Sequence, residues 1–365
     1  MKITRIARIS AVGAVAALAL AGCAANEAAA ENPGASAASG LEGTLKATGA
    51  SSQGAAQQAW VAAFQTANTG VTINYEPTGS GAGRENFIAG ASDFIGSDRA
   101  FKLDEFADGF QTCSSDGIVE VPLYISPVAV AFNLEGVDEL NLDAKTIAGI
   151  FAGTISNWND EAIAGQNEGV ELPDLAISPV HRSDDSGTTE TFTAYLGATA
   201  PDVWKHEADG VWPIQGGEAA QGTSGVVQAI KAGNGAIGYA DASQTSGLGQ
   251  VKVGVDGEYV AYSAEAAAAL VESSPLQDGR GDGDLVFEVD PAAAPAGSYP
   301  IALVSYLIAC EEYENADTAA LVKAYFEYVA SEEGQQAAAD NAGSAPISDG
   351  LREKVRTAID MIKVG

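Results

Sequence analysis

A strand, a turn of small residues and the start of a helix follow one another in AISPVHRSDDSGTTETF, residues 176–192. Apolar residues predict the strand at 176–180, and helical periodicity begins at residue 189. The turn between them carries Arg182 and Ser186-Gly187-Thr188. Because a helix N-terminus offers unpaired backbone N–H groups and the positive end of a dipole, this turn predicts an anion-binding position.

Two earlier segments repeat the same order of strand, small-residue turn and helix. Ser51-Ser52 lie between a predicted strand at 45–48 and a predicted helix at 55–67, and Gly79-Ser80-Gly81 follow the next strand. This alternation indicates an open, mostly parallel α/β sheet covered by helices. Ligands of such sheets bind beyond the carboxyl ends of the strands. We therefore expect the three turns to surround one tetrahedral anion, with Arg182 supplying a charge-assisted contact.

The composition limits the possible partners. The chain has 365 residues, with 18 Lys and Arg against 49 Asp and Glu, a formal net charge of -31 and 46% hydrophobic residues. This length and apolar content predict two folded domains. Nucleic acid is not an expected partner, because polyanions are held by clustered Lys and Arg. No Cys and His spacing matches a zinc site, so we expect no metal and no cofactor.

The beginning of the chain predicts export and a membrane anchor. Basic residues precede a short apolar run at 9–20, which is too short to span a bilayer as a helix. The run ends in Leu20-Ala21-Gly22-Cys23, which resembles the lipobox of bacterial lipoproteins and implies removal of residues 1–22 and lipidation of Cys23. An ordinary secretory signal is the alternative. Residues 23–43 are mostly small and predict a flexible tether.

The cysteine count predicts one disulfide. If Cys23 carries lipid, Cys113 and Cys310 remain. An exported protein lies in an oxidising compartment, where two leftover thiols are expected to pair. Two buried free thiols are the alternative.

The motifs taken together resemble a known family. They are HRSDDSGTTETF (181–192), ATGASS (47–52), PTGSG (77–81), DFIGSD (93–98), ISNWND (155–160) and GAIGY (235–239). They are similar to segments of the phosphate-binding protein of the bacterial high-affinity phosphate ABC importer, over most of the mature chain. The resemblance implies the type II periplasmic solute-binding fold, in which two doubly wound α/β lobes are joined by two crossing strands and hold a ligand in the cleft between them.

The resemblance also implies an organisation and a cellular setting. Lobe I would comprise residues 44–123 and 300–365, and lobe II residues 124–299. The cleft would close by a hinge motion near residues 123–128 and 299–304. The protein would bind inorganic phosphate without catalysing a reaction. Held by its lipid at the outer face of the cytoplasmic membrane, it would deliver the ligand to ABC permease subunits.

Carried over position by position, the resemblance implies a phosphate site. Its residues are Ser51, Ser52, Ser80, Asp98, Arg182, Ser186, Gly187 and Thr188, with Asp184 orienting Arg182. Some members have Thr-Phe where this chain has Ser51-Ser52. Asp98 would accept a hydrogen bond from a ligand that carries a proton. Phosphate keeps a proton near neutral pH and can donate it to a carboxylate, whereas sulfate has none to give, and a site built on such a bond rejects an analogue that lacks it.

Other functions fit the sequence less well. A receptor for sulfate or molybdate is the main alternative, although Asp98 argues against it. A serine hydrolase would need a His base, for which His181 and His206 are the only candidates, and no Gly-x-Ser-x-Gly elbow occurs. A signalling or adhesion protein at the cell surface is the third.

Overall fold

The computed structural model describes residues 40–365. The predicted signal peptide, the lipidation site at Cys23 and nearly all of the predicted tether lie outside the described residues. Within residues 40–365, no helix has both the length and the apolar character needed to cross a bilayer.

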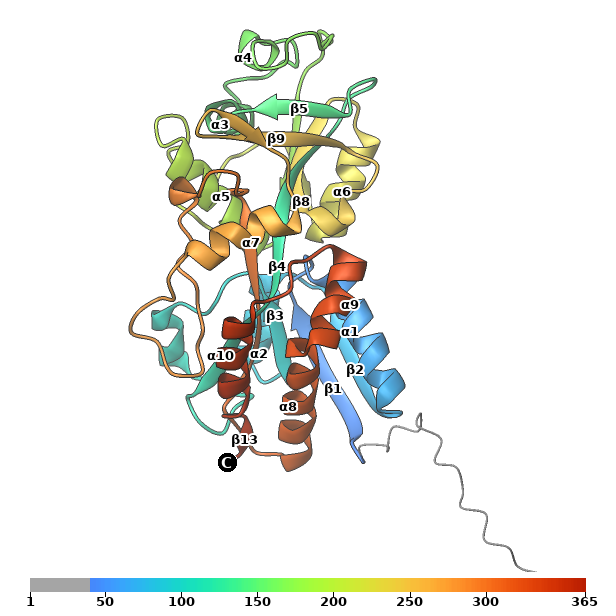
Figure 1. Ribbon diagram of the computed structural model, residues 1–365, viewed down its shortest axis with the longest axis vertical. Helices are drawn as coiled ribbons and strands as arrows, with labels where there is room; N and C mark the ends of the chain where they lie inside the picture. Colours follow the sequence, from blue (N-terminus) through green and yellow to red (C-terminus); the bar gives the residue numbers. More distant parts are fainter. Residues whose placement is uncertain (1–39) are drawn as a thin grey trace, which may run out of the picture. The chain divides into compact units, whose positions relative to one another are not determined.

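Strands and helices alternate along the described part of the chain (Figure 1). The strands are β1 (Glu42–Gly49), β2 (Gly70–Glu76), β3 (Phe94–Ser97), β4 (Ile118–Asn133), β5 (Glu139–Leu142), β6 (Ser178–Arg182), β7 (Glu218–Ala220), β8 (Ala236–Asp241), β9 (Gly249–Val255), β10 (Glu258–Val260), β11 (Ala302–Cys310), β12 (Glu312–Tyr313) and β13 (Lys363–Val364). The helices are α1 (Gly54–Ala67), α2 (Ser80–Ile88), α3 (Ala144–Phe151), α4 (Glu161–Ala164), α5 (Gly187–Thr199), α6 (Gly222–Ala232), α7 (Ala264–Ser273), α8 (Ala316–Ala330), α9 (Glu332–Ala342) and α10 (Asp349–Ile359). Three short 3-10 helices are η1 (Leu103–Asp108), η2 (Ala242–Gln244) and η3 (Pro291–Ala293).

The main sheet has the strand order β2-β1-β3-β11-β4-β8-β6-β7, and β9 joins it beside β4. Strand β1 pairs in parallel with β2 and β3, and β6 pairs in parallel with β7 and β8. Strands β4 and β11 run antiparallel to each other and to their outer neighbours. The predicted α/β sheet is therefore confirmed, and it is mixed because two long strands link its parallel halves.

Strands β4 and β11 divide the fold into two lobes. Strand β4 pairs with β11 over residues 118–127 and with β8 over residues 128–133. We use lobe I for the part around β1, β2 and β3 with α1, α2, α8, α9 and α10, which is lower in Figure 1, and lobe II for the part around β5 to β9 with α3 to α6. The register of the β4–β11 pair shifts between Ser305 and Tyr306, which marks a β-bulge.

Two predicted boundaries differ from the structure. Strand β1 begins at Glu42, inside the predicted tether. The segment 277–287 was assigned to lobe II but pairs with lobe I, where Glu120 N donates to Gly283 O at 3.0 Å and Leu285 N donates to Glu120 O at 2.9 Å. The Gly- and Asp-rich composition around this segment does not encode that contact, because it depends on a strand more than 150 residues earlier in the chain.

Lobe I is tied together by packing and by one disulfide. Ala56, Trp60 and Phe64 recur on one face of α1 and are buried, as the predicted helical period requires. Trp60 Nε1 also donates to Gly334 O at the start of α9 at 2.7 Å. The predicted disulfide is confirmed, since Cys113 is bonded to Cys310 at the end of β11 across 197 residues.

Candidate functional site

The N-terminal ends of four helices meet where the two lobes touch. In front of α1, Ser51 Oγ lies 3.0 Å from Oγ1 of Thr223, which belongs to the first turn of α6. At the start of α2, Ser80 Oγ accepts a hydrogen bond from Asp98 N at 3.1 Å. At the start of α5, Thr188 Oγ1 donates to Asp98 Oδ2 at 2.7 Å. The structure thus brings the three predicted turns together and adds a fourth.

Three of these four helices begin without a side-chain cap. No side-chain hydrogen bond caps α1 at Gln53, α2 at Gly79 or α6 at Gln221. Every other α-helix of the described chain is capped by a Ser, Asp or Asn side chain. Some N–H groups at these starts are bonded to other segments, since Gly222 N donates to Asp184 Oδ1, Thr223 N to Ser51 Oγ and Gly81 N to Asp185 O. The helix ends still present their partial positive charge and their remaining N–H groups toward an anion.

Asp98 lies at the centre of this cluster and is only 6% exposed. Its Oδ1 accepts hydrogen bonds from Ser52 Oγ at 2.5 Å and from Ser305 Oγ at 2.6 Å. Its Oδ2 accepts one from Thr188 Oγ1 at 2.7 Å. A carboxylate offers about four acceptor positions. Oδ1 is therefore saturated, and Oδ2 keeps one position for another donor.

Arg182 supplies the positive charge of the site and is 3% exposed. Its Nε donates to Asp184 Oδ1 at 2.8 Å, and its Nη2 contacts Asp184 Oδ2. Burial opposes the charge of Asp184, but the Arg182 contacts and the Gly222 N–H, which donates at 3.1 Å, hold the pKa of Asp184 below its ordinary value. A Cβ added at Gly79, whose φ is positive, would lie 2.5 Å from Asp184 Oδ2. Only glycine allows this close approach of the turn to the ion pair.

The remaining predicted residues belong to the first turn of α5. Ser186 Oγ accepts from Thr189 N at 3.2 Å and caps the helix. A Cβ added at Gly187 would lie 2.5 Å from Asp98 Cβ, so the backbone of lobe II packs directly on the carboxylate of lobe I. All of the predicted site residues therefore lie in one interlobe cluster, and their contact with a ligand stays a prediction.

Sequence reasoning missed two members of the cluster. Ser305 is a small hydroxyl residue in the apolar run 301–308, and this exception to the apolar pattern is the signal that could have revealed it. Thr223 lies in Gly-Thr-Ser-Gly directly before a predicted helix, the same kind of turn as the other three.

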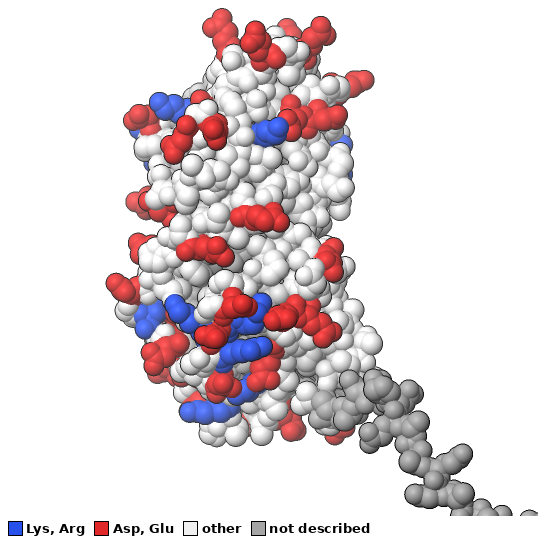
Figure 2. All heavy atoms as spheres, viewed as in Figure 1, with Lys and Arg blue, Asp and Glu red and all other residues white. Residues whose placement is uncertain are grey.

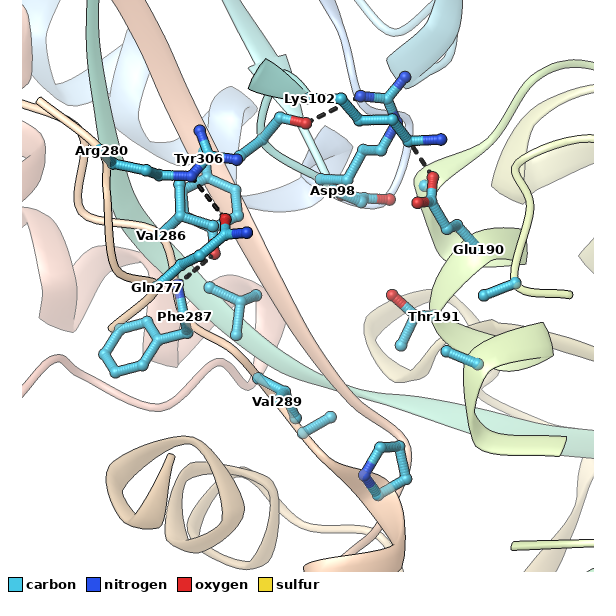
Figure 3. Close-up of a pocket in the computed structure, with 18 of the residues that line it drawn as sticks. Asp98, Lys102, Glu190, Thr191, Gln277, Arg280, Val286, Phe287, Val289 and Tyr306 are labelled. Carbon is cyan, nitrogen blue, oxygen red and sulfur yellow. Dashed lines mark hydrogen bonds and ion pairs between the residues drawn. The ribbon is translucent and has the colours of Figure 1, made fainter. Parts of the chain in front are cut away.

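Two ion pairs and a groove also lie between the lobes. Arg84 Nη2 is 3.3 Å from Asp185 Oδ1, and Arg99 Nε is 3.0 Å from Glu190 Oε2. Asp98 is part of the wall of a cavity of about 620 Å³. Figure 3 shows Asp98 near Lys102 of lobe I, with Glu190 and Thr191 of α5 across the cavity and an apolar wall contributed by Val286, Phe287 and Val289. Of the predicted site residues, Asp98 and Gly187 line this cavity.

The imidazole of His181 does not pair with a serine. Its Nδ1 lies 2.9 Å from Arg182 O, its Nε2 lies 3.0 Å from Gly216 O, and its ring stacks on Trp212. Because both nitrogens face carbonyl oxygens, this residue offers no support for a serine hydrolase. Within residues 40–365, no three His, Cys, Asp or Glu side chains gather as metal ligands would.

The surface charge does not attract anions at long range. Figure 2 shows Asp and Glu over both lobes, with Lys and Arg gathered mainly on the lower lobe. Salt screens such charges beyond about 8 Å at physiological ionic strength. Any anion affinity must therefore come from the helix ends, the hydroxyl groups and Arg182.

Comparisons with known proteins agree with this geometry. A model of the PBP superfamily domain matches residues 32–333. The phosphate-binding protein PstS 3 of Mycobacterium leprae (strain TN) is 35% identical over 325 residues, which is 87% of each chain. The phosphate-binding protein PstS of Pasteurella multocida (strain Pm70) is 30% identical over 292 residues, which is 78% of this chain and 80% of that relative.

A solved structure confirms the fold. The high affinity periplasmic phosphate-binding protein PfluDING, bound with phosphate, superposes with a TM-score of 0.71 at 24% identity, covering 86% of this chain and 93% of that one. The predicted type II periplasmic binding fold is therefore confirmed.

Proposed function

The chain belongs to the phosphate-binding proteins of the PBP superfamily, and from this premise we propose that it is an extracytoplasmic receptor for inorganic phosphate. One observation carries the proposal. Three helix N-termini without side-chain caps converge on Asp98 and Arg182 between the lobes. Such a convergence suits a small anion whose charge is met by partial positive charges and one guanidinium.

The cluster divides the recognition of phosphate into two tasks. Backbone N–H groups, that of Thr188 among them, and the hydroxyls of Ser51 and Ser80 donate to phosphate oxygens, while the hydroxyl proton of Thr188 is directed to Asp98. Arg182 adds charge-assisted donors that Asp184 leaves unused. Asp98 performs the second task, because the open acceptor position on its Oδ2 takes the hydroxyl of a protonated phosphate. Sulfate would place an acceptor against that oxygen, so the site rejects it.

Binding is coupled to contact between the lobes. Asp98 belongs to lobe I, whereas Thr188, which donates to it, belongs to lobe II. A ligand held by both lobes favours their closed arrangement, and opening then requires bending where β4 and β11 cross. The closed receptor presents its ligand to an ABC permease, and opening on that partner releases it.

The test is titration calorimetry on the chain from residue 23 onward with Cys23→Ser. Phosphate is expected to bind tightly, and sulfate and molybdate are expected not to displace it. Arg182→Met should weaken phosphate binding by about 10–100-fold, because it removes charge-assisted hydrogen bonds. Arg356→Met, an exposed arginine on α10, is the matched control and should bind as the parent does.

Two results would contradict the proposal. Binding of sulfate or molybdate in preference to phosphate would keep an anion receptor and change its ligand. Binding of no oxyanion would mean that the uncapped helix ends serve only the fold.

The anchor is a separate part of the proposal and rests on the lipobox-like Leu20-Ala21-Gly22-Cys23. Diacylglyceryl modification of Cys23 would hold the receptor at the outer face of the cytoplasmic membrane, since two acyl chains anchor a protein stably. Mass spectrometry of the N-terminal peptide should find Cys23 as the lipidated first residue. The full chain with Cys23→Ser should leave the membrane fraction, and retention there would contradict the assignment.

A further inference from the structure

A chain of buried hydrogen bonds reaches Asp98 from the far side of α1. Tyr325 Oη on α8 donates to Gln57 Oε1 at 2.8 Å, and Gln57 Nε2 donates to Gln53 Oε1 at 2.9 Å. Gln53 Nε2 donates to Ser305 Oγ at 2.7 Å, and Ser305 Oγ donates to Asp98 Oδ1 at 2.6 Å. The first four side chains are at most 1% exposed. Hydroxyl and amide groups are thus linked in the buried interior of lobe I.

The direction of this chain is set by a backbone carbonyl. Gln53 Nε2 also donates to Tyr306 O at 3.1 Å. A carbonyl oxygen only accepts, so the amide nitrogen of Gln53 must face it and the amide oxygen must face Gln57. Ser305 therefore receives a hydrogen bond from Gln53 and directs its own hydrogen to Asp98. A hydrogen bond donated to a carboxylate favours its ionised form.

The position of Ser305 on the crossing strand β11 explains how its side chain contacts Asp98. The register of β11 against β4 shifts between Ser305 and Tyr306. A β-bulge changes the local twist and re-aims side chains, often beside a functional site. The serine stands 207 residues from Asp98 in the sequence and lies on the strand that links the two lobes.

We propose that Ser305, oriented by Gln53, is a positioning residue that holds the Asp98 side chain with Oδ2 presented as the acceptor and thereby sets the selectivity of the site for protonated phosphate. This inference rests on the proposed function, because it concerns the same site. Ser52 and Ser305 occupy both acceptor positions of Oδ1, so the ligand hydroxyl is left with Oδ2. Ser305 itself does not need to touch the ligand.

Removal of the hydroxyl tests the proposal. Ser305→Ala should weaken phosphate binding by about 10–100-fold, the effect of losing a hydrogen bond to a charged group. Discrimination against sulfate should fall as well, because Oδ2 of Asp98 is no longer held in place as the acceptor for the ligand hydroxyl. Gln53 keeps Tyr306 O as an acceptor in this variant, so no buried amide is orphaned.

Other ionisable groups near Asp98 require a control. Burial raises the pKa of Asp241 on β8 to about 6, and the charge of Asp98 adds to that rise. Burial, and next the charge of Asp98, raise the pKa of Tyr75 on β2. Both anion titrations are therefore repeated in Asp241→Asn, and the loss of selectivity caused by Ser305→Ala should persist in that background.

A second buried serine serves as a control that distinguishes a positioning role of Ser305 from a purely structural one. Ser126 on β4 is also buried and donates to a buried carboxylate, Asp241 Oδ2, at 2.7 Å. Ser126→Ala should lower stability without changing the phosphate-to-sulfate ratio. Ser305→Thr, which keeps a hydroxyl, should restore much of the selectivity.

A double-mutant cycle decides the outcome. If Ser305 acts through Asp98, adding Ser305→Ala to Asp98→Asn should cause no further loss of phosphate affinity. An equal loss in both backgrounds, or unchanged affinity and selectivity in Ser305→Ala, would overturn the proposal. Failure of the parent protein to bind phosphate would instead overturn the proposed function, so the two failures are distinguishable.

Discussion

Asp98 and Asp241 are both buried carboxylates surrounded by hydroxyl groups, yet they use their oxygens differently. Asp241 accepts from Tyr124 Oη at 3.1 Å on both oxygens, from Ser126 Oγ at 2.7 Å and from the N–H and hydroxyl of Ser243 at 3.0 and 2.5 Å. Both of its oxygens are saturated. Asp98 receives three hydrogen bonds and keeps one position of Oδ2 open.

The difference teaches that burial does not identify a ligand-facing carboxylate. What distinguishes Asp98 is unused acceptor capacity at a boundary between lobes, because buried polar groups are normally satisfied within the protein. The donors to Asp241 come from β4 and from the turn after β8, whereas Asp98 takes Ser52 from lobe I and Thr188 from lobe II. We therefore expect Asp98, and not Asp241, to respond to both a ligand and closure.

The largest effect is expected from a substitution of Asp98 itself. Asp98→Asn replaces one acceptor oxygen by a donor, so the site should lose most of its discrimination between phosphate and sulfate. Sites that depend on such a hydrogen bond discriminate by about 10⁴–10⁵-fold. Competition calorimetry with the two anions measures the ratio. If the ratio of phosphate affinity to sulfate affinity is unchanged in Asp98→Asn, Asp98 does not accept a hydrogen bond from the ligand.

The next effect concerns the contact of lobe II with Asp98. A Cβ in Gly187→Ala would lie 2.5 Å from Asp98 Cβ and 2.9 Å from the backbone carbon of Asp98. Overpacking of this kind costs about 1–3 kcal/mol, so closure and phosphate affinity should fall by about 10–100-fold. The control is Gly197→Ala on the same helix, where the nearest atom would be 3.7 Å away. Equal affinities of the two variants would contradict the close packing.

The third effect is a pH dependence of the free energy of unfolding, and it is expected from Asp241. Burial raises the folded-state pKa of Asp241 from the ordinary 3.8 to about 6, so the folded protein keeps this proton at a pH where the unfolded chain has lost it. The contribution of Asp241 to the free energy of unfolding should therefore fall by roughly 3 kcal/mol as pH rises from about 4 to about 6. Urea unfolding across this range should show that slope disappear in Asp241→Asn. Parallel curves for the two proteins would contradict it.

The smallest effect tests charge rather than acceptor geometry. Glu190 is mostly buried, which raises its pKa, and Glu190→Gln removes its ion pair with Arg99, while Arg99 keeps Glu105 at 2.7 Å. Partly exposed pairs contribute about 0.2–1 kcal/mol, so phosphate affinity should fall by less than about fivefold. Calorimetry at low and high salt should show the difference shrink with salt. An effect as large as that of Asp98→Asn would mean that interlobe charge governs closure.

Prediction from the sequence succeeded where the signal was local. Ser51-Ser52, Gly79-Ser80-Gly81 and Ser186-Gly187-Thr188 each stand between a strand and a helix, and the structure brings all three together between the lobes. The placement of Asp98 and Asp184 came from the family resemblance rather than from periodicity. Segment 277–287 was misassigned because its partner strand is remote in the sequence.

By itself, the sequence determined the order of strands and helices, the positions of the small-residue turns and the pair of cysteines available for a disulfide. These features depend on periodicity and residue type over short stretches. Only the tertiary structure decided which hydroxyls meet Asp98, since Ser52, Thr188 and Ser305 stand 46, 90 and 207 residues away from it. The number of hydrogen bonds that a buried carboxylate oxygen accepts depends on donors that are distant in the sequence, and no local sequence pattern reveals it.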